Sequence, residues 1–454
     1  METVFTLNIL LGILLFIFFL FGVITSIREN EKTAVFRLSI FTIIFPLPFF
    51  IVTLLPIPFK DEIAIGLLLI FSLIILILFL PIRGNKIEND TPLKCIDERD
   101  TMFSRNELKE GTERFEEYYK NNPDKKILDD NFRKRPGLLK KDSTYYNPFH
   151  FAAADSSFET IAELHSMVDG EPSECPVKVK DDEITEFIKK WAVKLGTKDC
   201  GITELKDYHL YTTGGRGDRY GNPILNNHKY AIAFTTAMDK TMIHSAPTGS
   251  IVMESAQQYL DSGTVAIQVA KFIRNLGYSA RAHIDGNYQV VCPLVARDAG
   301  LGEIGRMGLL MTPKLGPRVR ISVVTTNLPL LIDERKPDYS VTDFCKMCKK
   351  CAIACPSGAI SFEDKKDIEG VKRWQINSEA CFTLWSTFGT DCGRCVSVCP
   401  YSHPDNFFHN FIRFGINNSK IFRRFAVKMD DAIYGRKPPT AELPDWMMIY
   451  PEDD

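Results

Sequence analysis

The chain has 454 residues, of which 45% are apolar and 25% charged, and its formal net charge at pH 7 is −2. This near-neutral balance excludes a globally basic nucleic-acid-binding protein, and no stretch of interleaved basic and aromatic residues overrides it. The length suffices for one large core or for two domains. Eight of the twelve cysteines fall between Cys345 and Cys399, a spacing that disfavours a disulfide framework.

Three long apolar runs come before residue 83. They are Val4–Ile27, Leu38–Phe59 and Ile63–Ile82, and each is close to the roughly 20 residues that span a bilayer as a helix. The first run follows Met1-Glu2 and is too long for a cleavable secretory signal peptide. Four prolines interrupt the second run, which is therefore either a broken span or a re-entrant segment. We expect three transmembrane helices.

Basic residues near the ends of these runs indicate the orientation of the chain. The first loop contains Arg28, Lys32 and Arg37, the second loop contains only Lys60, and Arg83 and Lys86 follow the third run. Loops rich in Lys and Arg stay on the cytoplasmic side of a membrane. The N-terminus should then lie outside and the large domain in the cytoplasm.

The rest of the chain divides by composition and periodicity. We expect a polar linker at 84–145, an α/β domain at 146–340, a cysteine-rich lobe at 341–405 and a C-terminal tail at 406–454. Within the α/β domain, helices are predicted at Ile184–Leu195 and Ala256–Leu276, and strands at Lys229–Thr236 and Arg320–Thr326. Strands that alternate with helices indicate a sheet covered by helices.

Two four-cysteine motifs carry the most specific chemical signal. The first is Cys345-x2-Cys348-x2-Cys351-x3-Cys355-Pro356, and the second is Cys381-x10-Cys392-x2-Cys395-x3-Cys399-Pro400. Three close cysteines and a Cys-Pro ending are typical of bacterial ferredoxins, in which the fourth thiolate binds the neighbouring cluster. Structural zinc sites, the alternative, usually have two CxxC pairs separated by a longer loop. We therefore expect two [4Fe–4S] clusters in a ferredoxin-like lobe.

Crossed ligation assigns the eight thiolates to two sets. One set is Cys345, Cys348, Cys351 and Cys399, and the other is Cys355, Cys381, Cys392 and Cys395. The long gap after Cys381 departs from the compact spacing and makes this ligand the least certain. Such clusters transfer single electrons and catalyse nothing by themselves. A membrane-anchored ferredoxin-type electron carrier is therefore one interpretation of the chain.

Four segments upstream of the cysteines need a further explanation. They are Phe272-Ile-Arg-Asn-Leu-Gly-Tyr278, Ala299-Gly-Leu-Gly-Glu-Ile-Gly-Arg306, Leu315-Gly-Pro-Arg-Val-Arg320 and Thr326-Asn-Leu-Pro-Leu330. Together with the double cysteine motif, they resemble the corrinoid-dependent reductive dehalogenases over roughly residues 145 to 405. The related epoxyqueuosine reductases share the Ala-Gly-Leu-Gly segment and the clusters. Each segment alone is weak, and the combination is specific.

The resemblance implies a fold, cofactors and partners. A nitroreductase-like α/β domain and the ferredoxin-like lobe would hold a cobalamin between them with its lower base detached. Electrons would pass through the clusters to cobalt, the substrate would be an organohalide, and the donor a ferredoxin, a flavoprotein or a quinone-linked carrier. The Asp-x-His-x-x-Gly motif with which other corrinoid proteins supply a histidine to cobalt is absent, because Asp207-Tyr-His209 lacks the glycine.

The resemblance also implies catalytic residues. The family's tyrosine proton donor, one helix before the Phe-Ile-Arg segment, matches Tyr259. An arginine of the Pro-Arg-Val-Arg segment and a polar residue after the Leu-Gly-Tyr turn match Arg320 and Asn287. The asparagine fits only with a short insertion, so Asp285 or His283 are alternatives. A phenol of pKa about 10 keeps its proton at neutral pH, and an arginine stabilises the phenolate left behind.

Each of these residues also has an ordinary structural explanation. Tyr259 fits a half-exposed helix position, Arg320 a surface cation at the start of a strand, and Asn287 a turn beside a glycine. Gly300 and Gly302 would either permit a tight turn or let the backbone approach the corrinoid. The joint register of Tyr259, Arg320 and Asn287 against the family segments favours the functional interpretation of these three residues, and the two interpretations of the glycines stay open.

Respiratory members of the family carry a twin-arginine export signal, which this chain lacks, so we expect a self-anchored enzyme that faces the cytoplasm. An epoxyqueuosine-reductase-like enzyme remains an alternative. That family is soluble, uses an aspartate near the position of Asp285 and has a basic surface for tRNA. Three membrane helices argue against it.

Overall fold

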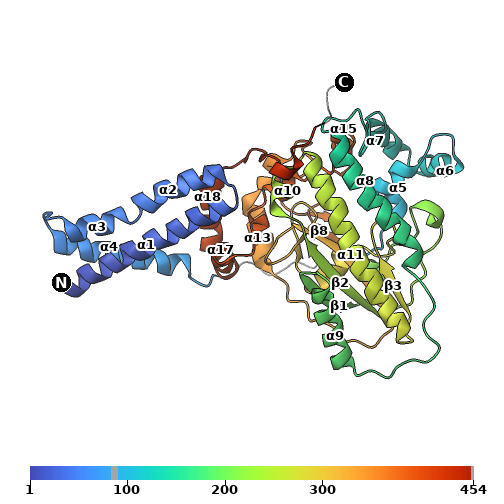
Figure 1. The fold of residues 1–454 in the computed structure, drawn as a ribbon, viewed down its shortest axis with the longest axis horizontal. Helices are drawn as coiled ribbons and strands as arrows, with labels where there is room; N and C mark the ends of the chain where they lie inside the picture. Colours follow the sequence, from blue (N-terminus) through green and yellow to red (C-terminus); the bar gives the residue numbers. More distant parts are fainter. Residues whose placement is uncertain (83–89, 451–454) are drawn as a thin grey trace. The chain divides into compact units, whose positions relative to one another are not determined.

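The computed structural model describes residues 1–82 and 90–450 and divides into two units (Figure 1). The first unit consists of Met1–Lys86, Tyr339–Cys348 and Pro404–Pro438. The second consists of Ile87–Asp338, Lys349–His403 and Pro439–Asp454. The boundaries therefore cut through the predicted cysteine-rich lobe and through the predicted tail.

Apolar helices fill the N-terminal part of the first unit. They are α1 (Glu2–Arg28), α2 (Lys32–Ile44), α3 (Leu47–Leu54) and α4 (Lys60–Leu78). Among the described residues three spans are long and apolar enough to cross a membrane, because α2 and α3 together form the span Lys32–Leu54. This span begins at Lys32 rather than at Leu38 and breaks at Pro46, which has no N–H to donate. Arg83 and Lys86, used to infer the orientation, lie outside the described residues.

Three later helices complete the first unit: α13 (Tyr339–Cys348), α17 (Phe407–Asn418) and α18 (Lys420–Tyr434). Arg423 pairs with Asp343 at 3.0 Å, and Ser340 Oγ donates to Asn417 Oδ1 at 3.0 Å. The first part of the predicted tail is thus two packed helices. It belongs to the same unit as the apolar helices and the start of the first cysteine motif.

An antiparallel sheet forms the centre of the second unit. Its strands, in the order β1-β2-β6-β3, are β1 (Asp199–Glu204), β2 (Tyr230–Ala237), β6 (Val319–Thr326) and β3 (Ala280–His283). In register, Thr236 of β2 lies opposite Arg320 of β6. Both ends of each of the two predicted strands lie within one residue of the ends of β2 and β6. The alternation of strands with helices in the sequence did not predict that the strand pairings of this sheet are antiparallel.

Helices cover both faces of this sheet. The long helix α11 (Gly249–Asn275) packs against β2, β6 and β3 and lies beside α8 (Pro148–Glu163) (Figure 1). On the other face, α12 (Cys292–Asp298) packs against β2 and β6. Buried residues such as Ile232, Phe234 and Val324 form the core on the α11 side. Further elements are α9 (Asp181–Lys194), α10 (Lys240–His244) and the pair β4 (Glu303–Ile304) and β5 (Leu310–Met311).

The cysteine-rich part of the second unit is built from short elements. They are α14 (Lys350–Ala354), β7 (Lys366–Ile368), β8 (Val371–Arg373), α15 (Ser378–Phe388) and α16 (Arg394–Ser397). Chain preceding α8 is attached directly to α15: Gly137 N–H donates to Ser386 O at 2.8 Å, and Leu139 N–H to Gly389 O at 3.0 Å. The lobe is therefore tied to residues that precede the sheet.

The interpretation of 84–145 as a solvated linker does not hold for residues 90–145. They contain α5 (Met102–Glu107), α6 (Glu113–Asn121) and α7 (Pro123–Arg133). Phe115, Tyr119 and Phe132 are buried. The Arg105 guanidinium, 2% exposed, binds Asp129 and Glu379 of α15 at 2.7 Å each. A small aromatic core and a buried ion pair hold this segment to the lobe.

We predict that Asp129→Ala destabilises this segment by about 3–5 kcal/mol, because the Arg105 guanidinium would keep its burial and lose a charge partner. Amide hydrogen exchange of residues 102–133 in the intact protein measures the change. Glu186→Ala, which removes an exposed pair with Lys190, is the control and should cost less than about 1 kcal/mol. Equal effects of the two substitutions would contradict a structural role of the buried pair.

Candidate active site and cluster ligands

Four of the eight motif cysteines approach one another in the second unit. Cys355 follows α14, Cys381 lies in α15, and Cys392 and Cys395 lie just before and within α16. Burial and the negative charges of neighbouring thiolates raise the pKa of Cys381 to about 12 and that of Cys392 to about 11. Cys355 is among those neighbours in both cases. Cys395 has a raised pKa for the same reasons, and its neighbours include Cys351.

This donor set fits a metal cluster. Several thiolates packed together in a buried place repel one another and lose hydration, so they need compensating cations. Iron in a [4Fe–4S] cluster supplies that charge and accepts four thiolates. Cys355, Cys381, Cys392 and Cys395 are one of the two sets predicted from crossed ligation, and Cys351, which was assigned to the other set, is also a neighbour of Cys395.

The other four cysteines, Cys345, Cys348, Cys351 and Cys399, are all buried. Cys345 and Cys348 belong to α13 of the first unit, and Cys351 and Cys399 to the second unit. Lys349, between the second and third, takes a left-handed conformation with φ 57° and separates α13 from α14.

Tyr259 and Arg320 lie against each other. Tyr259 is on α11 and Arg320 near the start of β6, and the guanidinium Cζ is 4.9 Å from the centroid of the phenol ring. Burial raises the pKa of Tyr259 to about 12, and the positive charge of Arg320 opposes that shift. The phenol therefore holds its proton throughout the neutral range, with a cation beside it that favours the phenolate when the proton leaves.

Two residues that the sequence reasoning missed hold Arg320 in place. Arg320 Nη2 donates to Ser255 Oγ at 2.6 Å and to Asp391 Oδ2 at 3.1 Å. The Ser255 hydroxyl also donates to Asp391. Ser255 is one helical turn before Tyr259 on α11, and Asp391 immediately precedes Cys392. The tyrosine is thereby connected, through one guanidinium and one carboxylate, to a proposed cluster ligand.

Asp285 and Asn287, which both lie in the turn after β3, have different partners. The Asn287 Oδ1 atom accepts a hydrogen bond from Arg281 Nη2 at 2.8 Å. By contrast, the Asp285 carboxylate is close enough to raise the pKa of Tyr259 and of Tyr288. Burial in turn raises the pKa of Asp285, against the opposing charges of Arg216 and Arg320.

His283 is also engaged elsewhere. It is buried, its Nε2 lies 2.9 Å from Thr325 Oγ1, and its Nδ1 accepts the Gln289 N–H at 3.1 Å. Of the three polar residues considered for this position, Asp285 is thus the one whose charge reaches the tyrosine.

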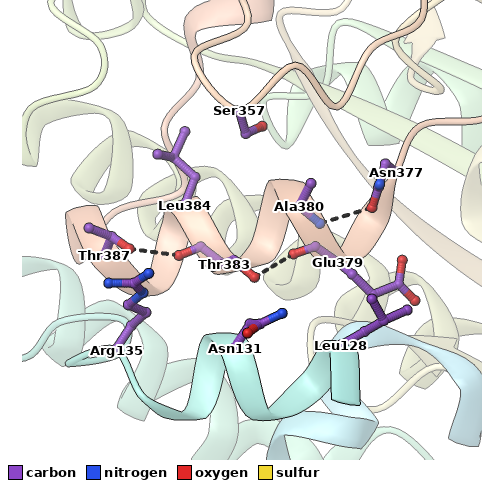
Figure 2. A pocket seen from close by; sticks show the side chains of 10 residues that line it. All are labelled: Leu128, Asn131, Arg135, Ser357, Asn377, Glu379, Ala380, Thr383, Leu384 and Thr387. Atoms are coloured by element: carbon purple, nitrogen blue, oxygen red, sulfur yellow. Dashed lines mark hydrogen bonds between the residues drawn. The ribbon is translucent and has the colours of Figure 1, made fainter. Parts of the chain in front are cut away.

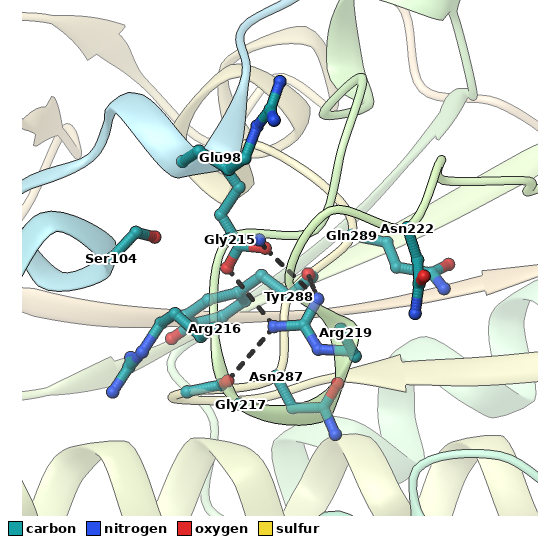
Figure 3. Close-up of polar contacts among 12 residues, drawn as sticks. Glu98, Ser104, Gly215, Arg216, Gly217, Arg219, Asn222, Asn287, Tyr288 and Gln289 are labelled. Carbon is teal, nitrogen blue, oxygen red and sulfur yellow. Dashed lines mark hydrogen bonds and ion pairs between the residues drawn. The ribbon is translucent and has the colours of Figure 1, made fainter. Parts of the chain in front are cut away.

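Arg219 fixes the backbone of this turn (Figure 3). It donates to Tyr288 O at 2.7 Å and to Gly286 O at 3.3 Å, and it pairs with Glu98 at 3.2 Å. Glu98 Oε2 also accepts the Gly215 N–H at 2.7 Å. Glu98 belongs to the segment expected to be a linker, which therefore contributes to the support of the candidate site.

The glycines of the Ala-Gly-Leu-Gly segment have different roles. Gly302 immediately precedes β4, and a Cβ atom there would come within 2.3 Å of Met311 O, so close packing against β5 requires glycine. Gly300 has φ +79°, which favours glycine, and a Cβ there would have open space, with Glu334 O nearest at 3.8 Å. Packing thus explains Gly302, and backbone conformation explains Gly300.

His209 has no free ring nitrogen for a metal. Its Nε2 is 2.9 Å from Asp298 Oδ2, and its Nδ1 accepts the Lys206 N–H at 3.1 Å. The residue is fully buried. Its imidazole links the loop after β1 to Asp298, the last residue of α12.

A separate groove lies between α7 and α15 (Figure 2). Its lining includes Leu128, Arg135, Ser357, Ala380 and Thr383. Glu379 at its edge is already paired with Arg105. None of the groups around Tyr259 contributes to it, so it is distinct from the candidate active site.

Known proteins resemble this chain in two ways. Residues 344–403 match the family model of the 4Fe-4S dicluster domain. The chain is 36% identical over 231 residues to a tetrachloroethene reductive dehalogenase of Sulfurospirillum multivorans. This alignment covers 49% of this chain and 45% of that protein. It is 36% identical over 196 residues to a tetrachloroethene reductive dehalogenase of Desulfitobacterium hafniense, with coverage of 41% and 35%. The chain thus matches less than half the length of these relatives.

A solved structure shows the same fold. It is a catabolic reductive dehalogenase in complex with 3-bromo-4-hydroxybenzoic acid, with a TM-score of 0.60 and 26% sequence identity. The match covers 68% of this chain and 46% of that one. The mixed α/β domain with a dicluster iron–sulfur lobe is therefore a fold shared with reductive dehalogenases.

We predict that Cys395→Ser lowers the iron content of the anaerobically purified protein from about eight to about four atoms per chain, because one four-thiolate set loses a ligand. Iron analysis with low-temperature electron paramagnetic resonance of the reduced protein measures this loss. Cys175→Ser, which changes an exposed cysteine outside both motifs, should keep the full content. Unchanged iron in the Cys395 variant would refute its assignment as a ligand.

Proposed function

From its homology to the reductive dehalogenases, we propose that this chain is a corrinoid and iron–sulfur oxidoreductase that removes halide from an organohalide. The observation that carries the proposal is the group formed by Tyr259, Arg320 and Asp391, which joins a proton donor on the sheet domain to the cysteine-rich lobe. Similarity to named dehalogenases over 49% of the chain supports it.

Two [4Fe–4S] clusters and a base-off cobalamin complete the proposed enzyme. When bound, these groups supply single electrons and the metal centre at which the carbon–halogen bond is reduced. The eight motif cysteines would hold the clusters, and the nitroreductase-like sheet domain would hold the corrinoid. Engagement of both ring nitrogens of His209 supports a cobalt that takes no histidine from this position.

The protein's own residues hold the proton and donate it to the substrate. The Tyr259 Oη atom has no hydrogen bond to any part of the chain that the structure describes, and its raised pKa keeps the proton in place until charge develops on the substrate. Arg320 then stabilises the phenolate through its charge. Asp391 and Ser255 keep the guanidinium at the ring, and Asn287 acts on this site only indirectly, by fixing Arg281.

The membrane and the donor are part of the proposal. The apolar N-terminal helices would anchor the enzyme, and the larger number of basic residues in the first loop than in the second supports a cytoplasmic catalytic domain. A ferredoxin, a flavoprotein or a quinone-linked carrier would supply electrons.

The decisive experiment is anaerobic purification in detergent from cells supplied with cobalamin, followed by metal analysis and a halide-release assay with reduced methyl viologen. We expect about eight iron atoms and about one cobalt per chain. Tyr259→Phe should bind both metals and release halide at least ~100-fold more slowly, because a general acid contributes about that much. Tyr278→Phe, whose hydroxyl only binds Val177 O, is the matched control and should stay active.

Three outcomes would count against this proposal. Iron without cobalt would leave a membrane-anchored electron carrier. Cobalt without halide release from any organohalide would favour the epoxyqueuosine-reductase-like alternative. Full activity in the Tyr259 variant would exclude this tyrosine as the acid and direct attention to Asp285 and Tyr288.

Asp391→Asn tests the support of Arg320. We expect kcat for halide release to fall about 10- to 100-fold with KM unchanged, because loss of an outer hydrogen-bond partner typically has this effect. Iron content should be retained. Asp333→Asn, which loosens a contact to Lys189 at the other side of the domain, is the control and should keep wild-type kcat. A fall in iron content that parallels the fall in kcat would show that Asp391 only maintains the lobe.

A further inference from the structure

The helix pair α17–α18 of the first unit adjoins the apolar N-terminal helices through aromatic rings. Ring centroids of Phe408 and Phe18 are 5.4 Å apart, and those of Phe422 and Phe79 are 5.1 Å apart. Gly22 of α1 makes room for Phe408, whose ring lies 3.2 Å from the position of a Cβ there. The pair is thus packed on the sides of α1 and α4.

The position of these contacts along α1 determines how deep they lie in a bilayer that α1 crosses. Phe18 precedes the end of α1 at Arg28 by about 15 Å at 1.5 Å per residue. The hydrocarbon core of a bilayer is about 30 Å thick. If α1 crosses the membrane, Phe18 lies well inside its hydrocarbon region. The beginning of α17, which touches Phe18 and Phe21, must then lie at or below the level of the lipid headgroups.

The outer face of α17 is a stripe of phenylalanines. Phe407, Phe411 and Phe414 follow one another at helical spacing and are 73%, 37% and 58% exposed. One edge of this stripe touches the apolar helices, since Phe407 lies beside Phe21 and Phe411 beside Phe18 and Phe79. The exposed parts of the three rings, if left in water, forgo the free energy of apolar burial. The opposite face buries Phe408 and Ile416. The stripe continues the exposed apolar surface of α1, which includes Leu14, Ile17 and Phe21.

The outer face of α18 combines apolar and basic residues. Arg424 and Lys428 are exposed, stand one turn apart and have no ion pair in the described chain, and Phe425 beside them is 40% exposed. Residues 407–437 contain seven Lys and Arg and only two Asp. Basic side chains above an apolar face attract anionic lipid headgroups.

We propose that α17–α18 is an interfacial membrane element, distinct from the three spans. Its phenylalanine stripe lies among acyl chains, and Arg424 and Lys428 bind anionic headgroups. The helix pair also holds α13 through the contacts of Arg423 with Asp343 and of Asn417 with Ser340. The lipid surface thereby supports the helix that carries Cys345 and Cys348. This inference does not depend on the proposed dehalogenase activity.

The first test uses the full-length protein in vesicles of phosphatidylcholine that carries a photoactivatable diazirine in its acyl chain. Mass spectrometry of the digested protein locates the lipid adducts. We expect adducts between residues 407 and 425 as well as in α1 and α4, and none at Leu225, an 82% exposed apolar residue of the second unit. Labelled α1 and α4 with an unlabelled 407–425 segment would overturn the proposal.

The second test concerns the headgroups. Amide hydrogen exchange of α18 should be about tenfold slower in vesicles that contain phosphatidylglycerol than in phosphatidylcholine alone, and Arg424→Gln with Lys428→Gln should remove the difference. Lys178→Gln with Lys194→Gln, two lysines of the second unit, should leave it intact. Equal exchange in the two lipids would reject the headgroup contacts. A difference that persists in the Arg424 and Lys428 variant would reject these residues as its cause.

Discussion

The second unit depends on the interaction of the Arg320 guanidinium with Asp391. Arg320 comes from the sheet and Asp391 from the cysteine-rich lobe, 71 residues later in the chain, and their atoms are 3.1 Å apart. A guanidinium that is largely removed from water needs such a partner, since an unpaired buried charge costs several kcal/mol. Because the same guanidinium lies on the Tyr259 ring, the position of the lobe, the ionisation of the tyrosine and the geometry of the proposed cluster ligands are linked.

The helix α11 gives this arrangement its precision. Ser255 and Tyr259 are four residues apart and therefore share one face of the helix. On this face the Ser255 hydroxyl accepts a hydrogen bond from Arg320, and the Tyr259 ring lies against the Arg320 guanidinium. The helix is 27 residues long and buried along much of its length. Rigid support of this kind would keep the proposed proton donor in one orientation, which proton transfer requires.

The cysteine spacing and the apolar runs were readable from sequence because both are local patterns. β2 and β6 were placed almost to the residue for the same reason. The segment around Phe115 and Phe132 was taken for a linker because its small aromatic core lies within a charged composition. A segment with a low apolar fraction exposes most of its residues, but a few of its aromatic rings can still be fully buried.

Contacts across long sequence separations were not readable. No pattern in the sequence around Asp391 predicts that Arg320 is its partner. The choice between Asn287 and Asp285 depends on a turn in which Gly286 has φ +74°, and such a turn reverses the direction of side chains that spacing alone would align. Family resemblance located the turn, and only three-dimensional packing selected the carboxylate that reaches Tyr259.

The first unit joins the apolar N-terminal helices to the helix that carries the first two motif cysteines. Its three segments come from the beginning, the middle and the end of the chain, and α13 lies in the middle one. Bringing such distant segments together costs loop-closure entropy, which the packing of α17 and α18 on the apolar helices must offset. The ion pair of Arg423 in α18 with Asp343 in α13 holds α13 against this helix pair. Two of the proposed cluster cysteines, Cys345 and Cys348, are therefore carried by a helix that packs on α17 and α18, which in turn pack on the apolar N-terminal helices.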